Sequence, residues 1–336
     1  MLLSGKPPRG YYGLIANYGD NTVTPLDLTS PLAPIAHAAV GLGALQSHAF
    51  GIDISLDGMF ALVTNNGSAT VTPLDLANPL IPVAKPVVAV GANPYCIAIS
   101  PNGLFALVVN NGSNSVTPLD LSNPLFPIAQ APIGVGIAPR GIAIAPNNLS
   151  AIVSSNGNST VVPLDLTNPL IPVAQLPVIV PNGPMIIAIS PNGLFAILTD
   201  NGASQLSSLD LANPLVPVVY GPFVTNISPN GMAISPNGLF AIVANYSVGD
   251  GAITPQDLTN PLAPVNQFQV DLGGATSGSV NVSISPNGRF ALITNQNTNN
   301  VTPLDLSNPL VPVPKTPVGV GTTPISLGKT IYYRKP

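Results

Sequence analysis

The chain has 336 residues and a formal net charge of −4, and only 7% of its residues are charged. Nucleic-acid binding needs a basic surface, which this composition does not supply, and an apolar content of 46% is too high for a disordered chain. The most hydrophobic window, residues 125–146, contains Arg140 and several prolines, so neither a transmembrane helix nor membrane insertion is expected.

One phrase recurs along the whole chain, and its central Asp sets the register. This Asp occurs at Asp27, Asp75, Asp120, Asp165, Asp210, Asp257 and Asp305. A nearly fixed period is typical of stacked or radially arranged units. Because no linker separates the units, we expect a single domain over residues 1–336. Its repeats lie near residues 11–51, 52–96, 97–141, 142–186, 187–231, 232–280 and 281–326.

Each unit contains four short predicted strands, which are clearest in the third repeat. They cover Ile97–Ser100, Leu104–Asn110, Ser115–Leu121 and the stretch around Phe126–Val135, as alternating or short apolar runs. Asn-Gly and Pro-Asn-Gly turns between them suit tight hairpins, and the 40 prolines leave no long helical window. The predicted fold is therefore an all-β, seven-bladed β-propeller with four antiparallel strands per blade.

The two ends of the chain are predicted to meet in one blade. The first unit starts with the strand Tyr11–Asn17 and has no convincing innermost strand before it. Residues 325–333 alternate well and are expected to supply that strand and close the ring, which removes open sheet edges.

Prolines recur at two places in the unit. The Pro of Thr-Pro-Leu-Asp-Leu falls in a strand with two neighbours, so a bulge or a frayed ladder is expected there. The last Pro of Asn-Pro-Leu-x-Pro-Val is expected on the outermost strand, where it would block edge pairing. Those prolines are Pro82, Pro127, Pro172, Pro217, Pro264 and Pro312.

The second strand of the unit carries a family resemblance. Residues 61–65 read ALVTN and residues 291–295 read ALITN, each after a turn that contains Gly. These strands resemble the YVTN family of β-propeller repeats, and the phrase LDLSNPLVPV at residues 304–313 resembles the LVIVP repeat. The resemblance covers essentially the whole chain and implies the propeller fold, which serves many functions.

Two polar positions recur in nearly every unit. The repeated Asp is expected to accept backbone N–H groups in an Asx turn, in preference to forming a ring of charge. A second ring of polar residues ends the second strand and is expected to cap the hairpin, a polar binding face being the alternative. Its members are Asn17, Asn65, Asn110, Ser155, Asp200, Asn245 and Asn295.

A third position differs in every unit and is the candidate binding site. It follows the loop that leads into the central channel, and loops on a rigid scaffold commonly carry function. Its residues are Phe50, Tyr95, Arg140, Met185, Asn230, Ser279 and Ile325. Arg140, near Tyr95 in the ring, is the first choice for contact with an anion or a partner. Unselected variation of an exposed loop is the alternative.

The sequence contains few residues of other reactive kinds. The single cysteine, Cys96, excludes an intramolecular disulfide and is expected to be buried. The two histidines, His37 and His48, have no cluster of partners, so no metal site and no cofactor are predicted. Five of the nine cations gather near the ends of the chain, where they solvate the tails or contact a neighbouring subunit. They are Lys6, Arg9, Lys329, Arg334 and Lys335.

These observations favour a non-enzymatic structural or interaction module that is surface-exposed or extracellular, although no signal peptide is visible. A protein partner or self-association is expected because low charge permits close contact, and no nucleic acid is expected.

Two alternatives remain open. The stretch SPNGLFALVVNN at residues 100–111 also resembles seven-bladed lactonase-type propellers. Those enzymes would need acid–base groups in the channel mouth, and this chain offers no Glu and only His37 and His48. A carbohydrate-binding propeller would have to use Tyr95 and Phe50 in place of Trp.

Overall fold

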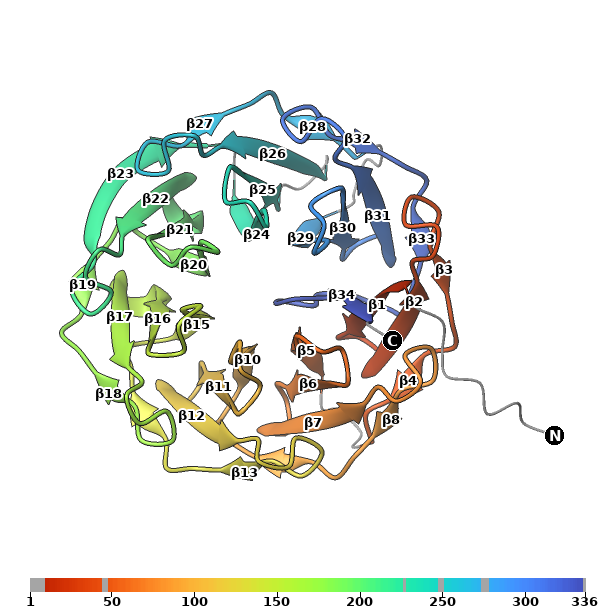
Figure 1. Cartoon of the computed structure of the whole chain (residues 1–336), viewed down its shortest axis with the longest axis horizontal. Helices are drawn as coiled ribbons and strands as arrows, with labels where there is room; N and C mark the ends of the chain where they lie inside the picture. Colours follow the sequence, from red (N-terminus) through yellow and green to blue (C-terminus); the bar gives the residue numbers. More distant parts are fainter. Residues whose placement is uncertain (1–9, 44–47, 226–227, 247–250, 273–277, 335–336) are drawn as a thin grey trace.

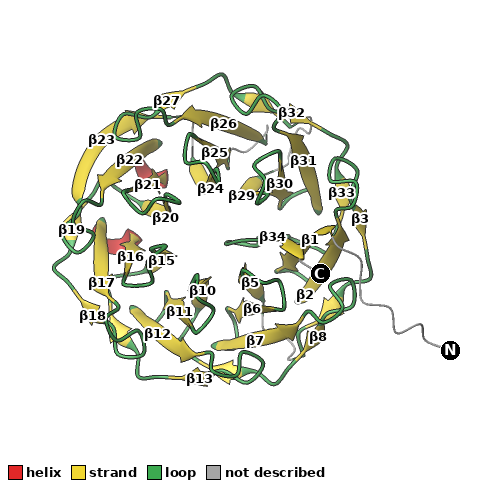
Figure 2. Ribbon diagram, in the orientation of Figure 1, coloured by secondary structure: helices red, strands yellow, loops and turns green. Residues whose placement is uncertain are grey.

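In the computed structural model, the chain forms a ring of seven antiparallel β-sheets around a central channel (Figure 1). The structure describes residues 10–43, 48–225, 228–246, 251–272 and 278–334. The prediction of an all-β, seven-bladed propeller is confirmed. Figure 2 shows two short 3₁₀ turns among the strands, η1 (Asn156–Asn158) and η2 (Asn201–Ala203). In the described ranges no helix is long and apolar enough to cross a membrane.

The innermost strand of each blade borders the channel. These strands are β5 (Ala49–Ile54), β10 (Pro94–Ile99), β15 (Pro139–Ile144), β20 (Pro184–Ile189), β24 (Pro229–Ile234), β29 (Ser279–Ile284) and, in the first blade, β34 (Ile331–Arg334). In β10 a bulge between Pro94 and Ile97 shifts the register, so the strand begins three residues before the predicted start at Ile97.

The second strands are buried along their whole length, except for the first two residues of β1. They are β1 (Gly10–Asn17), β6 (Phe60–Asn65), β11 (Phe105–Asn110), β16 (Ser150–Ser155), β21 (Phe195–Asp200), β25 (Phe240–Asn245) and β30 (Phe290–Asn295). Their alternation explains this burial, because successive side chains point to opposite faces. Phe105 and Leu107 pack toward the fourth blade, whereas Ala106 and Val108 pack toward the second.

The third strands pair along the second strands. They are β2 (Thr22–Asp27), β7 (Thr70–Asp75), β12 (Ser115–Asp120), β17 (Thr160–Asp165), β22 (Gln205–Asp210), β26 (Ala252–Asp257) and β31 (Asn300–Asp305). Each ends on the repeated Asp, whose Oδ1 accepts the backbone N–H two residues later at 2.8–3.0 Å. The predicted Asx turns are confirmed.

The outermost strand is interrupted in six blades. Its two halves are β3 (Ile35–Ala36) and β4 (Val40–Gly41), β8 (Val83–Ala84) and β9 (Val88–Ala89), β13 (Ile128–Ala129) and β14 (Ile133–Gly134), β18 (Val173–Ala174) and β19 (Val178–Ile179), β27 (Val265–Asn266) and β28 (Val270–Asp271), and β32 (Val313–Pro314) and β33 (Val318–Gly319). The predicted continuous strand around Phe126–Val135 is therefore corrected to two short segments. The Asn-Pro-Leu-x-Pro-Val prolines, such as Pro82, immediately precede these strands instead of lying on them.

The cause of the interruption is the Pro of the third strand. The carbonyl of Pro118 faces outward and accepts the backbone N–H of Gln130, so the missing N–H of Pro118 leaves a gap on that same side. The fifth blade has Ser208 at this position, paired with Tyr220, and its outer strand β23 (Val218–Val224) runs through. The predicted disturbance is confirmed in its location, and it takes the form of a break in the neighbouring strand.

The C-terminal segment closes the ring as predicted. β34 pairs antiparallel with β1, from Gly10 opposite Arg334 to Gly13 opposite Ile331. The segment before it also reaches the second blade, because Ile52 N donates to Leu327 O at 2.9 Å. It contacts the last blade through Asn281, whose Nδ2 donates to the carbonyl of Gly328 at 3.3 Å.

The core lies between the blades. Among the described residues, seven apolar clusters each join two adjacent blades. The cluster of the first and second blades, for example, includes Tyr12, Ile52 and Tyr332, all at most 2% exposed. Burial between neighbours all around the ring fixes the positions of the innermost strands and so the shape of the channel.

Candidate functional site

One end of the channel is closed by apolar side chains from the starts of the innermost strands. Met185, Val280 and Ile325 belong to different blades, are at most 7% exposed, and lie in one contact cluster. Ile186 and Leu327 complete this cluster, which we call the apolar plug. Two of the plug residues, Met185 and Ile325, occupy the candidate binding position of the sequence, so they are packed together and are not exposed loop residues.

Ser279 does not belong to this ring. It pairs with Asn295 at the position where Pro94 pairs with Asn110, so Val280 is the equivalent of Tyr95. Ser279 is fully buried, and its Oγ lies 3.4 Å from Asn295 Oδ1. The loop before it has no Pro to mark the register, which explains the error of one residue.

Arg140 and Tyr95 are direct neighbours at the rim of the plug. Arg140 Nη1 donates to the Tyr95 hydroxyl at 3.0 Å, and the guanidinium carbon lies 5.2 Å from the centre of the Tyr95 ring. Phe50 packs on the same ring at 4.2 Å between centroids. Burial raises the pKa of Tyr95, while Arg140 opposes that rise. The predicted proximity is confirmed, and a binding role for these residues stays a prediction.

Tyr18, His48 and Asn230 are not among the buried residues of the apolar plug. The Tyr18 ring meets Phe50 edge-on at 5.8 Å and stacks on His48 at 4.5 Å. Asn230 contributes its backbone carbonyl, which accepts a hydrogen bond from Thr199 Oγ1 at 2.9 Å. In the described part of the chain no group of three His, Cys, Asp or Glu side chains is placed to hold a metal ion.

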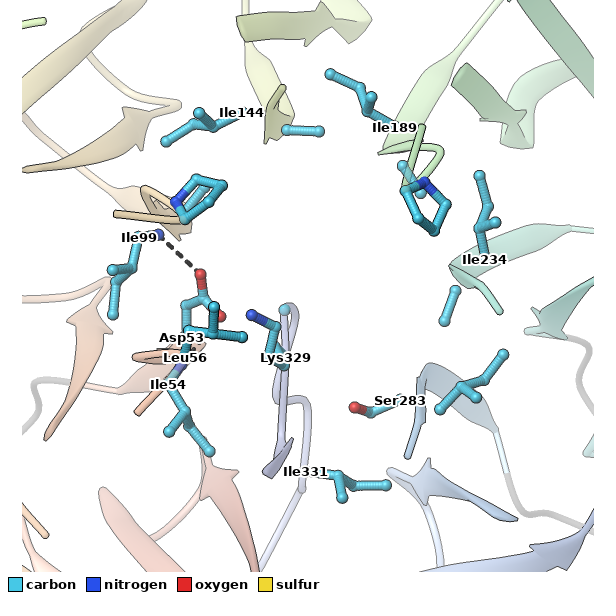
Figure 3. A pocket seen from close by; sticks show the side chains of 18 of the residues that line it. Asp53, Ile54, Leu56, Ile99, Ile144, Ile189, Ile234, Ser283, Lys329 and Ile331 are labelled. Carbon is cyan, nitrogen blue, oxygen red and sulfur yellow. Dashed lines mark hydrogen bonds between the residues drawn. The ribbon is translucent and has the colours of Figure 1, made fainter. Parts of the chain in front are cut away.

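The other end of the channel opens into a cavity of about 770 Å³. Each blade contributes an isoleucine to its wall at the same register position, which is the end of the innermost strand in six blades and the start of β34 in the first. We call this set the isoleucine ring, and most of it is labelled in Figure 3. Its members are Ile54, Ile99, Ile144, Ile189, Ile234, Ile284 and Ile331. Prolines of the following turns, such as Pro101 and Pro146, extend the apolar wall toward the opening.

Asp53 interrupts this apolar wall. Its Oδ2 accepts the backbone N–H of Ile99 at 2.7 Å and its Oδ1 accepts that of Ile54 at 2.9 Å. The carboxyl group is 7% exposed, and burial raises its pKa, whereas the charge of Lys329 acts in the opposite direction. Four other blades have Ala at this position, for example Ala98, so the backbone does not need a carboxylate here.

Lys329 brings the opposite charge into the same cavity. It lies in the closing segment, which is two residues longer between Pro324 and Ile331 than the corresponding stretch Pro94–Ile99. Figure 3 shows its side chain extending toward Asp53 inside the cavity. Among the described residues that line the cavity, Asp53 and Lys329 are the only ones with charged side chains.

Sequence reasoning placed Lys329 among the cations of the tails and did not select Asp53. The available signal was the departure from the repeat, since GIDI at residues 51–54 stands where other units read CIAI or GIAI. Of the other tail cations, Arg334 donates to the carbonyl of Leu76 at 2.6 Å. Lys6, Arg9 and Lys335 lie outside the described residues.

Comparison with known proteins was made for both sequence and structure. No protein-family model and no curated relative matches the sequence. Several similar solved structures are lactonases by name. A provisionally named 6-phosphogluconolactonase from Bacteroides uniformis aligns with 97% of this chain and 100% of its own, at 15% identity and a TM-score of 0.81. A second, from Bacteroides fragilis, covers 98% and 99% at 14% identity and a TM-score of 0.80.

A third similar structure is the periplasmic gluconolactonase of Pseudomonas aeruginosa, which covers 97% of this chain and 99% of its own. Its identity is 16% and its TM-score is 0.77. These comparisons correct the prediction of a non-enzymatic structural module, because they favour its lactonase-like alternative. Likeness at this identity establishes the seven-bladed fold, and the activity has to be argued from the cavity. The argument against an enzyme was an apparent lack of acid–base groups in the channel, and Asp53 supplies one.

Proposed function

We propose that this protein hydrolyses a cyclic ester, a lactone, in the cavity that contains Asp53 and Lys329. The single observation that carries the proposal is this carboxylate and ammonium group, the only charged pair among the described residues that line a mainly apolar cavity. A large concave site with a few convergent polar groups and a shifted pKa is the usual setting of catalysis. The named lactonases of the same fold support the choice of reaction.

Asp53 is suited to act as the general base. The backbone N–H groups of Ile99, Ile54 and Lys329 hold the carboxylate in place, and a remaining lone pair can accept a hydrogen bond from a water molecule. Burial raises its pKa toward the working pH, which strengthens it as a base. In the reaction, Asp53 takes a proton from water while the water oxygen bonds to the lactone carbonyl carbon.

Lys329 is suited to stabilise the negative charge that then develops on the carbonyl oxygen. An ammonium group in a site with little water interacts strongly with such an oxyanion. The tetrahedral intermediate collapses as its ring C–O bond breaks. The leaving oxygen takes the proton from Asp53, so the product is a hydroxy acid and the base is regenerated.

The test is hydrolysis followed by titration of the released acid, with both a sugar lactone and an alkyl lactone as substrates. Asp53→Asn is expected to lower kcat about 10²- to 10⁴-fold, and Lys329→Met about 10²-fold or more. Asp120→Asn makes the same chemical change in an Asx turn outside the cavity and should leave kcat unchanged. If the wild-type chain turns over neither lactone above the spontaneous rate, the proposal is wrong.

The pH dependence gives a second check. Only the ionised carboxylate acts as a base, so kcat/KM should fall as the pH is lowered through the raised pKa of Asp53.

We further propose that the repeats belong to the YVTN family, which the strands at residues 61–65 and 291–295 support.

A further inference from the structure

We infer that the cavity selects lactones with an apolar substituent over sugar lactones and their phosphates. This inference rests on the proposed hydrolysis and concerns the part of the substrate that does not react. It follows from the chemistry of the wall, from the charge of the site and from the surface around the opening.

The wall offers a sugar few partners. The isoleucine ring and the prolines beyond it are apolar, and the serines at three strand ends, Ser55, Ser100 and Ser190, donate hydrogen bonds within their own turns. Ser100 Oγ donates to the carbonyl of Phe105 at 2.7 Å, and Ser190 Oγ bonds to Asn192 Oδ1 at 2.7 Å. Ser283 differs, because its side chain points into the cavity (Figure 3), where its Oγ accepts the backbone N–H of Thr330 at 3.2 Å. A polyhydroxylated ring would leave most of its hydroxyl groups without partners here, which costs binding energy.

The charge of the site also opposes a phosphate group. Phosphate recognition normally uses Arg or Lys side chains or a helix N-terminus. The cavity lining, as far as the structure describes it, contains a single cation, Lys329, and Asp53 balances that charge. A dianion entering this apolar channel would lose its hydration without gaining compensating charge.

The opening continues the apolar character of the wall. Leu56, which lines the cavity, is 72% exposed. The residues at the equivalent position of the next two turns, Pro101 and Pro146, are also apolar and line the cavity. A cavity of about 770 Å³ lies within the size range of sites for small organic molecules, so a six-membered lactone with an alkyl tail fits it.

The experiment compares five substrates with the purified full-length chain. They are δ-valerolactone, δ-hexalactone, δ-octalactone, glucono-δ-lactone and its 6-phosphate. We expect kcat/KM to rise about fourfold for each added methylene group, as burial of a CH₂ predicts, with the sugar lactones the poorest substrates. Ile144→Asn with Ile189→Asn should lower kcat/KM for δ-octalactone more than for δ-valerolactone, and so remove the gain from the alkyl tail. Ile171→Asn, on the exposed outer surface, is the matched control.

The possible failures are distinguishable. If a sugar lactone is turned over faster than δ-octalactone, the inference is overturned and the proposed hydrolysis stands. If the Ile144 and Ile189 variants keep the full preference for the alkyl tail, the tail binds elsewhere and the inference is again overturned. If none of the five substrates is hydrolysed, the proposed function fails and this inference fails with it.

Discussion

Ser207 donates a hydrogen bond to Asp200 Oδ2 over 2.7 Å in the fully buried interior of the fifth blade. Five other blades place an Asn and a Thr in this arrangement, as in Asn110 Nδ2 and Thr117 Oγ1 at 2.8 Å. The predicted hairpin role of this polar ring is thus confirmed for those blades as a bond between the second and third strands. Asp200 is the single acid in the ring, and burial raises its pKa to about 7.

The first prediction concerns pH and stability. Because the folded state raises the pKa of Asp200 from 3.8 to about 7, the folded chain holds this proton more tightly than the unfolded chain. Stability contributed by the protonated group should therefore be lost as the pH rises through about 4 to 7, by at most about 4 kcal/mol. Urea unfolding across this range should show the loss, and Asp200→Asn should remove it.

The reciprocal change is the control. Asn110→Asp places a carboxyl group in the equivalent site of the third blade and should introduce a similar loss of stability at higher pH. Equal pH dependence in the wild type and Asp200→Asn would contradict the buried carboxyl as its source.

The second prediction concerns the continuous outer strand β23. Ser208→Pro should divide this strand as in the other blades, because the outward N–H is lost. We expect a destabilisation of about 1–3 kcal/mol and faster amide hydrogen exchange at Phe223 and Val224. Ser208→Ala keeps the backbone N–H and loses only the 2.6 Å bond to the Pro261 carbonyl, so its exchange pattern should stay close to the wild type.

The third prediction concerns ring closure. A chain that ends at Thr330 lacks β34, exposes the edge of β1 and loses the burial of Ile331 and Tyr332. Unfolding by denaturant should show a loss of about 4 kcal/mol or more, and sedimentation should show new association through the open edge. A chain that ends at Arg334 keeps the strand and should behave as the full chain; equal stability of both would rule out closure as a source of stability.

The fourth prediction concerns Cys96, which was expected to be buried and is 6% exposed. Burial raises the pKa of its thiol to about 12, so almost no reactive thiolate is present at neutral pH. A disulfide reagent should label the native protein at least about 10³-fold more slowly than the unfolded protein. Rapid labelling of the native chain at pH 7 would show that this blade opens readily.

The strands and turns of the blades could be predicted from the sequence because the same apolar pattern and turn residues recur in each repeat. Alternation in Phe105–Asn110, the turns that contain Gly and the period of the Asp together predict four strands per blade and their order. Closure by residues 325–333 followed from the same alignment, since the first repeat lacked one strand. The divided outer strand was missed because it depends on which side of Pro118 faces its neighbour.

The candidate site was harder, because it depends on what converges at the axis of the ring. Variation among repeats identified Tyr95 and Arg140 as neighbours, and no local pattern indicated that Met185 and Ile325 would meet in a plug. Asp53 and Lys329 are 276 positions apart, and only closure of the ring brings them into one cavity. Comparison of each repeat with its neighbours, position by position, would have marked Asp53 as the exception.

The apolar plug fills one end of the channel, and the cavity lies at the other end. Met185, Val280 and Ile325 pack together across the end of the channel opposite the cavity. A hydroxy acid formed in the cavity must leave before another lactone can enter. Its carboxyl group ionises in water, and re-entry of that anion into the mainly apolar cavity would cost its hydration, so the polarity that the reaction creates opposes return of the product.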